Sequence, residues 1–244
     1  MPRSGAASHD PLKIKFDSRA TPTYRSVVMV KRPNDSETRQ QLLQAAVKCF
    51  AHSGYAAASV QQIVDDARVS KPALYYYFKD KAGLFQSLVN EAHDKKFELM
   101  QAAAARAGDL RGQLVEILTG LFDYFQKNRE LMRLSMATAF ASPGELPPKL
   151  CYLDKCERNF EFIHSLMKQA RKSGELNNAF DSEELALGFH GQANSHLMAH
   201  LLMPDCRLNR RTAERVVELF LAGAAAKKQA GSIILKPAKR KEKS

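Results

Sequence analysis

The sequence lacks the features that define several large classes of protein. No stretch approaches the roughly 18 consecutive apolar residues that a membrane span requires, so we expect no membrane partner. The opening segment, MPRSGAASHDPLKIKF, has no apolar core, and we expect no secretory signal. The four cysteines are scattered and form no CxxC pair. These absences predict a cytoplasmic protein with reduced thiols.

Catalytic patterns are also missing. The sequence contains no Gly-rich phosphate loop, no recognisable nucleophile–base pairing and no set of metal ligands. His196 and His200 are four residues apart, a spacing that can bind zinc, but no Glu completes an HExxH pattern. Structural histidines are the favoured interpretation. We therefore expect a protein that is not an enzyme and that has no metal and no cofactor.

The net charge of +11 is concentrated at the two ends of the chain. Residues 1–33 hold seven Lys or Arg against two Asp, which gives +5, and residues 236–244 hold five against one Glu, which gives +4. The remaining residues carry only +2. Basic tails attract DNA without regard to its sequence. For the C-terminal run KPAKRKEKS, a solubilising tail without a dedicated role is an equal alternative.

Residues 59–85, SVQQIVDDARVSKPALYYYFKDKAGLF, carry the clearest pattern in the chain. Val60, Ile63, Val64 and Ala67 recur at helical spacing, which indicates a short helix with one buried face. A second short helix begins near Ser70, which can cap it, and includes Pro72 near its start. Its buried anchors are Leu74 and Phe78. Two short helices joined by a tight turn are typical of a helix-turn-helix that reads duplex DNA.

The same stretch resembles the tetracycline-repressor (TetR) family of bacterial transcription regulators. The resemblance is carried by Ile63, Ala67, Val69, Ser70, Leu74, Tyr75, Tyr76, Tyr77, Phe78, Lys81 and Leu84, and upstream by Arg39, Leu43, Ala45, Ala46, Phe50, Gly54 and Tyr55. Two positions depart from the usual pattern. Arg68 stands where Gly is common, so we expect a non-glycine residue in a tight backbone conformation. Pro72 stands where a small residue is common.

The resemblance implies which side chains contact DNA. Lys81, at the start of the following helix, is implied as a phosphate contact, assisted by the free N–H groups of a helix N-terminus. Lys71 is the best candidate for a base-edge contact, and Ser59 can cap its helix or bind phosphate. The expected DNA-binding set is Ser59, Ser70, Lys71, Pro72, Ala73, Tyr75, Tyr76 and Lys81.

The rest of the chain reads as helices, so we expect an all-α fold. Helices are predicted from Asp35 or Ser36 to Ser53, Asp80 to Ala107, from Asp109 onward, Glu130 to Phe140, Pro148 to Ser173, Asp181 or Ser182 to Leu202, and Asn209 to Lys228. The predicted parts are a disordered basic extension (1–33), a three-helix DNA-binding domain (34–80), a larger helical domain for effector binding and dimerisation (81–230), and a basic tail (231–244).

The resemblance also implies a homodimer that binds a palindromic operator and releases it on binding a small-molecule effector. It would be associated with the nucleoid when bound. For the effector pocket we expect Phe122, Phe125, Met136, Phe160, His164, Phe189 and His190. For the dimer interface we expect Leu185, Val216, Phe220 and Gly223. The alternative is a nucleoid-associated DNA-binding protein of the same fold that takes no ligand; a close-packed core without a cavity would favour it.

Overall fold

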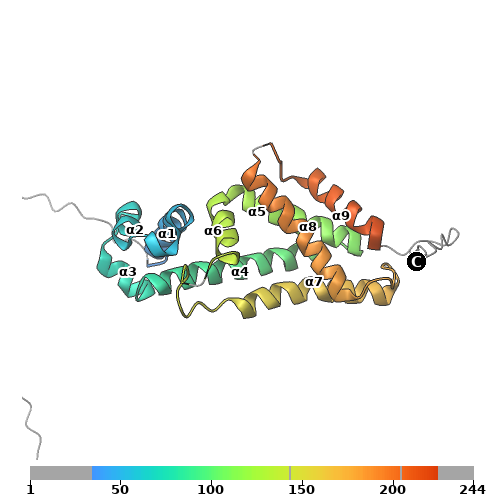
Figure 1. Cartoon of the computed structure of the whole chain (residues 1–244), viewed down its shortest axis with the longest axis horizontal. Coiled ribbons are helices and arrows are strands. Elements are labelled where there is room, and N and C mark those ends of the chain that lie inside the picture. The colour runs from blue at the N-terminus through green and yellow to red at the C-terminus, as the bar shows by residue number, and fades with distance from the viewer. Residues whose placement is uncertain (1–34, 143, 204, 225–244) are drawn as a thin grey trace, which may run out of the picture. The chain divides into compact units, whose positions relative to one another are not determined.

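The computed structural model describes residues 35–142, 144–203 and 205–224, and within them the chain forms nine α-helices and no strand (Figure 1). The all-α class predicted from the sequence is confirmed. The helices are α1 (Asp35–Ala57), α2 (Val60–Ala67), α3 (Lys71–Phe78), α4 (Lys81–Ala104), α5 (Leu110–Lys127), α6 (Arg129–Ala139), α7 (Leu153–Ser173), α8 (Ser182–Leu202) and α9 (Arg210–Ala224). None of these helices is long and apolar enough to cross a membrane. The predictions for residues 1–33 and 231–244 lie outside the described ranges.

Three helices begin at the aspartates that the sequence indicates. Asp80 accepts a hydrogen bond from the Gly83 N–H at 2.7 Å, and Asp109 accepts one from Gly112 at 3.0 Å. Asp181 caps α8 in a reciprocal capping box with Glu184. Each carboxylate satisfies an N–H group that has no partner within its own helix. The starts of α4, α5 and α8 are therefore encoded locally.

Two predicted boundaries differ from the structure. Gly54 interrupts α1 with φ 72° and ψ 169°, as expected of a helix-ending glycine, but one more turn continues to Ala57. The seventh helix begins at Leu153 rather than at Pro148. The segment before it is held against α4, because Gln86 accepts a hydrogen bond from the Cys151 N–H at 2.8 Å and donates one to the Cys151 carbonyl at 2.6 Å. These bonds hold the segment without helical structure.

The described residues form two hydrophobic cores, joined by α4 and α6. The N-terminal core is built from α1 to α3 and the first half of α4, where Leu84 and Leu88 are buried. The C-terminal core is built from the second half of α4 and from α5 to α9. Leu134 of α6 is buried in the N-terminal core, whereas Met132 of the same helix belongs to the C-terminal core. The expected division at residues 80 and 81 stays a prediction.

Candidate functional site

The turn between α2 and α3 contains the tight conformation expected at Arg68. This residue is left-handed, with φ 56° and ψ 39°, and its N–H donates to the carbonyl of Asp65 at 3.0 Å. The Val69 N–H donates to the Val64 carbonyl at 2.9 Å. The hydrogen bonds offset the strain of a non-glycine residue at positive φ, so the sharp turn forms without glycine.

No other described residues pack on the outer face of α3. Leu74 and Phe78 are buried, as predicted, while Lys71, Pro72 and Tyr75 are exposed. Tyr76 is 76% exposed, and Ala73 is half-buried. This face offers a cation and two phenols to a partner.

The expected caps of α2 and α3 are wrong in one respect. Ser59 and Ser70 do stand at the N-cap positions, but neither side chain makes a capping hydrogen bond. Both serines are exposed. Their hydroxyl groups therefore remain available to a ligand or to water.

The resemblance implies that Lys81 contacts phosphate, but its ammonium already has partners within the chain. Its ammonium donates to the carbonyl oxygens of Tyr55 at 2.9 Å, Ala56 at 3.1 Å and Ala58 at 3.1 Å. These atoms belong to the end of α1 and the link that follows it, where carbonyls lack partners within a helix. All three ammonium hydrogens are thus used, so the main observed role of Lys81 is to join α4 to α1.

Two further contacts hold the helix-turn-helix unit together. The Tyr77 hydroxyl donates to the Asp35 carboxylate at 2.8 Å, which joins α3 to the start of α1. Arg39 forms an ion pair with Glu91 on α4 and lies over the Phe78 ring, 5.4 Å from its centre. Tyr77 is therefore a structural residue, whereas its neighbour Tyr76 faces outward.

A cavity of about 550 Å³ lies between α4, α6, α7 and α8. Four of the residues predicted for an effector pocket line it: Phe125, Met136, Phe160 and His190. A smaller branch of about 90 Å³ shares His93 and Ser135 with this cavity and extends to Leu134 in the N-terminal core. The volume suits a small organic ligand.

The other three predicted pocket residues are not in this cavity. Phe122 is completely buried in the C-terminal core, and Phe189 packs edge-on against Phe220 with ring centres 5.5 Å apart. His164 lies 3.0 Å from the Ser182 hydroxyl and 3.2 Å from the Glu161 carboxylate. Aromatic residues at helical spacing are more often core than lining, and Phe122 and Phe189 follow that rule.

Sequence reasoning missed the polar lining that α4 and α7 supply. His93 and Lys96 of α4, and Cys156 and Asn159 of α7, all line the cavity. The sequence does contain an indication of this lining. Lys96 lies four residues after Ala92 and four before the buried Met100, so it falls on the face of α4 that otherwise points inward. A lysine on such a face indicates a polar space inside the fold.

The cavity keeps its histidines neutral at physiological pH. Burial, together with the positive charges of Lys96, Lys155 and Arg158, lowers the pKa of His93 to about 4. Burial and the charge of Lys96 likewise lower the pKa of His190 to about 4. The nearby Asp94 opposes this effect at His93 only weakly, since its carboxylate is bound by Lys155 at 2.6 Å and Arg158 at 2.8 Å.

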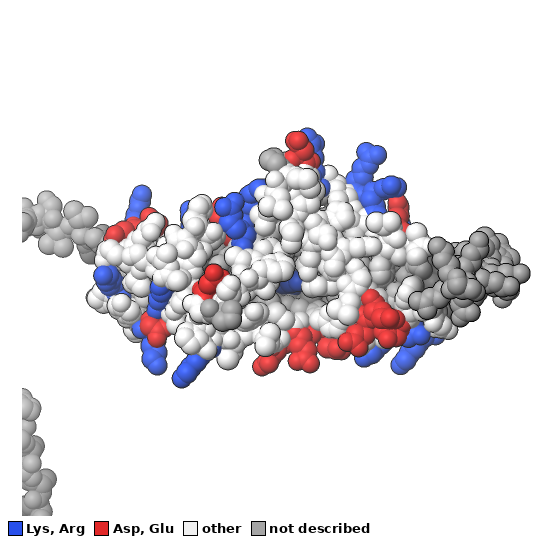
Figure 2. Space-filling view, in the orientation of Figure 1, with Lys and Arg blue, Asp and Glu red and all other residues white. Residues whose placement is uncertain are grey.

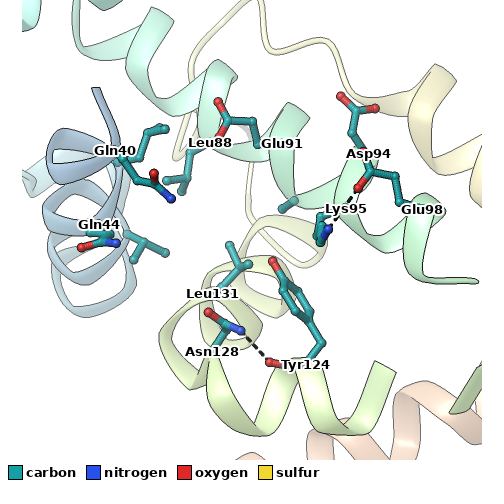
Figure 3. Close-up of a pocket in the computed structure, with 13 residues that line it drawn as sticks. Gln40, Gln44, Leu88, Glu91, Asp94, Lys95, Glu98, Tyr124, Asn128 and Leu131 are labelled. Atoms are coloured by element: carbon teal, nitrogen blue, oxygen red, sulfur yellow. Dashed lines mark hydrogen bonds and ion pairs between the residues drawn. The ribbon is translucent and has the colours of Figure 1, made fainter. Parts of the chain in front are cut away.

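A second, more open cavity of about 480 Å³ lies between α1, α4 and the α5–α6 junction (Figure 3). Its charged groups already have partners within the chain: Glu91 pairs with Arg39, and Lys95 pairs with Glu98 at 3.1 Å. Figure 3 shows the amides of Gln40 and Gln44 at its α1 side. This cavity is polar and internally neutralised, so it has weaker features of a ligand site than the first.

The expected dimer-interface residues are mostly buried within their own subunit. Leu185, Val216 and Phe220 belong to the C-terminal core, so they are not available to a partner, whereas Gly223 is exposed. The large apolar side chains that α8 and α9 expose are different ones: Leu187, Met198, Leu202 and Leu219. Leu185, Val216 and Phe220 therefore lie on the inner faces of α8 and α9.

His196 and His200 have partners within the chain. A ring nitrogen of His196 lies 2.8 Å from the Gln192 carbonyl, and one of His200 lies 2.5 Å from the Cys206 carbonyl. The second nitrogen of His200 is 3.4 Å from the Arg129 guanidinium. These contacts fit structural histidines.

The helix-turn-helix region is similar to known proteins. Residues 42–88 match the model described as bacterial regulatory proteins, tetR family. The uncharacterised regulator YuxN of Bacillus subtilis is 28% identical over 111 residues, which are 46% of this chain and 36% of YuxN. The regulator TtgR of Pseudomonas putida is 24% identical over 185 residues, 72% of this chain and 87% of TtgR. Against YuxN and another B. subtilis relative, the chain spans less than half of the relative's length.

The fold extends the similarity beyond the helix-turn-helix. FadR of Bacillus subtilis, solved in complex with stearoyl-CoA, superposes with a TM-score of 0.67 at 20% identity, covering 75% of this chain and 98% of FadR. At that identity the likeness concerns the fold alone. Because it covers 75% of this chain, it extends beyond residues 42–88.

Proposed function

We propose that the chain is a member of the tetR family of bacterial regulatory proteins and acts as a ligand-responsive, DNA-binding repressor of transcription. The observation that carries the proposal is the outer face of α3. Lys71, Tyr75 and Tyr76 project from a helix whose opposite side is fixed by Leu74 and Phe78. A rigid helix with an unpacked face of donors suits the major groove of duplex DNA.

In this proposal, Lys71 contacts a base edge and the two exposed tyrosines bind backbone phosphates. Ser59 and Ser70, whose hydroxyls make no capping bond, add phosphate contacts at the starts of α2 and α3. Pro72 and Ala73 approach the bases closely, and the Ala73 methyl suits a thymine methyl. Lys81 supports these contacts from behind, by fixing the start of α4 to the end of α1.

We propose that the protein acts as a homodimer that reads a palindromic operator. The exposed face of α8 and α9 would supply the contact, with Leu187, Met198, Leu202, Leu219 and Gly223 on it. Exposed apolar side chains on two neighbouring helices favour association with a like surface. Two α3 helices spaced by about one turn of DNA, roughly 34–36 Å, would then read the two half-sites.

The cavity favours a regulator over a ligand-free nucleoid protein. A body that only needed to hold two DNA-binding units together would gain stability by filling a space of about 550 Å³. Two helices join that space to the helix-turn-helix unit. The α4 helix carries Lys81 at its start and Lys96 at the cavity, and α6 contributes Leu134 to the N-terminal core and Met136 to the cavity. A ligand that prefers one arrangement of these helices would shift the population of DNA-binding dimers.

The decisive experiment is selection of duplexes from a random library by the full chain, followed by fluorescence anisotropy. We expect a palindromic consensus whose half-sites are one turn apart. The Tyr76→Ala variant should lose affinity for that consensus, whereas an exposed aromatic on the body, in Phe140→Ala, should leave it unchanged. Failure to enrich any duplex, or equal binding by both variants, would contradict the assignment of α3.

A further inference from the structure

Lys96 is a cation in the large cavity without a counter-charge. It is half-buried in α4, and no carboxylate oxygen among the described residues lies within the 4.0 Å that defines an ion pair. Burial lowers the pKa of its ammonium, and the one group that opposes this is the Cys156 thiol. Burial in turn raises the pKa of that thiol, so the thiol is neutral at physiological pH and cannot pair with Lys96.

The other charged groups nearby do not neutralise Lys96 either. Glu157 is the one carboxylate among the lining residues, and it is exposed rather than paired with Lys96. Asp94 is held by Lys155 and Arg158 of α7. His93 and His190 are neutral, because burial and, to a lesser degree, the positive charge of Lys96 lower the pKa of each ring. The interior of the cavity is therefore positive, a condition that costs free energy unless an anion arrives.

A buried amide adds a second polar feature to the same space. Asn159 is 4% exposed and lines the cavity, and its side-chain oxygen has no hydrogen-bond partner in the described structure. Its side-chain nitrogen donates to the His93 carbonyl at 3.2 Å, which fixes the orientation of the amide. An unsatisfied group this deeply buried is unusual in a finished core and is typical of a ligand site.

The remaining lining is mostly apolar. Phe125, Met136, Leu153, Phe160 and Leu197 face the cavity from α5, α6, α7 and α8. The face shown in Figure 2 has a hollow between uncharged, white side chains near its middle, with a blue side chain recessed in it. A ligand that satisfies both parts of the cavity needs an apolar body and a charged end.

We propose that the effector is an amphipathic anion, a carboxylate joined to an apolar chain or ring, whose carboxylate pairs with Lys96 while its apolar part lies among the aromatic and aliphatic lining. This assignment rests on the proposed effector role of the cavity. The ion pair favours the charged form of Lys96, so binding removes the penalty of the unpaired buried cation. Cationic and neutral amphiphiles of the same length lack that gain.

The test uses three probes with the same twelve-carbon chain: dodecanoate, dodecan-1-ol and the dodecyltrimethylammonium cation. Isothermal titration calorimetry of each against the full chain measures binding without DNA. We expect dodecanoate to bind about tenfold or more tightly than the alcohol, and the cation most weakly. Equal affinity for acid and alcohol, preference for the cation, or no binding of dodecanoate would overturn the proposal.

Variants then assign the charge to one side chain. Lys96→Met keeps the length and removes the charge, so it should abolish the preference for dodecanoate, while Lys96→Arg should retain part of it. Lys95→Met is the matched control, since Lys95 is the exposed neighbour and pairs with Glu98 outside this cavity. Retention of the full preference in Lys96→Met would also overturn the proposal.

Two further measurements separate misfolding and the DNA-binding role from ligand recognition. Without ligand, Lys96→Met should melt at the same temperature as the unaltered chain or higher, because an unpaired buried cation is removed. With dodecanoate, only chains that keep a cation at position 96 should gain melting temperature. Anisotropy with the selected duplex, in the absence of ligand, tests DNA binding alone, so its failure leaves the calorimetric result standing.

Discussion

The Lys81 ammonium hydrogen-bonds the backbone carbonyl of Tyr55 at 2.9 Å and lies 4.6 Å from the centre of the Tyr55 ring. One side chain thus satisfies carbonyls at the end of α1 and packs on the aromatic residue that joins α1 to α4. The Tyr55 ring in turn packs edge-on against Phe85 of α4, with centres 5.2 Å apart. These contacts join the end of α1 to the start of α4 in the helix-turn-helix unit.

Replacement of Lys81 by Met should lower stability and DNA affinity together. Three hydrogen bonds to carbonyls are lost, and we expect the free energy of unfolding to fall by roughly 1–3 kcal/mol. Urea denaturation checks the first effect and anisotropy the second. If Lys81 contacted phosphate directly instead, stability would hold and the slope of log K against log salt would fall by about 0.9.

Substitutions of the adjacent residues Tyr76 and Tyr77 should affect different properties: operator affinity for Tyr76 and stability for Tyr77. Tyr76→Ala should weaken operator binding by on the order of 1–3 kcal/mol without changing the melting temperature, because its side chain is mostly exposed. Tyr77→Phe removes only the hydroxyl that donates to Asp35 and should cost about 1 kcal/mol of stability. Thermal melts and anisotropy on both variants check the split, and the reverse pattern would exchange their roles.

Leu219 and Phe220 test which face of α9 meets a partner. Leu219→Glu places a charge on the exposed face and should dissociate the dimer while the subunit stays folded. Phe220→Glu places an unpaired carboxylate in the subunit's own core, which costs several kcal/mol, and should unfold it. Sedimentation equilibrium and circular dichroism distinguish the outcomes. If the Leu219→Glu variant remained dimeric, the exposed face of α9 would not be the dimer interface.

Acidification should destabilise the protein through His93 and His190. The pKa of each ring is about 4 in the folded chain and 6.5 for an unburied histidine, as in the unfolded chain. Between pH 4 and 6.5 the unfolded chain therefore binds more protons than the folded chain. The free energy of unfolding therefore falls as pH decreases from 6.5 to 4, by roughly 1–2 kcal/mol per histidine after allowance for partial exposure.

The double variant His93→Gln, His190→Gln tests that origin. Its stability should depend less on pH over the same interval, whereas the exposed His52→Gln control should behave like the unaltered chain. Urea titrations at several pH values measure the difference. An unchanged pH dependence in the double variant would assign the acid sensitivity to other groups.

Local features of the sequence explain why the helix-turn-helix could be predicted closely and the body less so. Three helix starts are predictable because their N-cap aspartates, Asp80, Asp109 and Asp181, accept hydrogen bonds from residues two or three positions later. The buried face of α3 is predictable from the four-residue spacing of Leu74 and Phe78. The contacts of Lys81 within the chain could not be predicted locally, because its partners lie more than twenty residues earlier in the sequence. Periodicity also could not tell Phe122, in the core, from Phe125, at the cavity, since both face inward.

The α4 helix gives the chain the geometry of a lever. Lys81 and Lys96 are fifteen residues apart on the continuous helix α4, so about 22 Å separates the contact with α1 from the cavity. A tilt of about 5° at the cavity end would move the end at α1 by about 2 Å, and the two subunits of a symmetric pair would double that change between their α3 helices. A molecule that fills the cavity without tilting α4 would be an occupant and not an inducer.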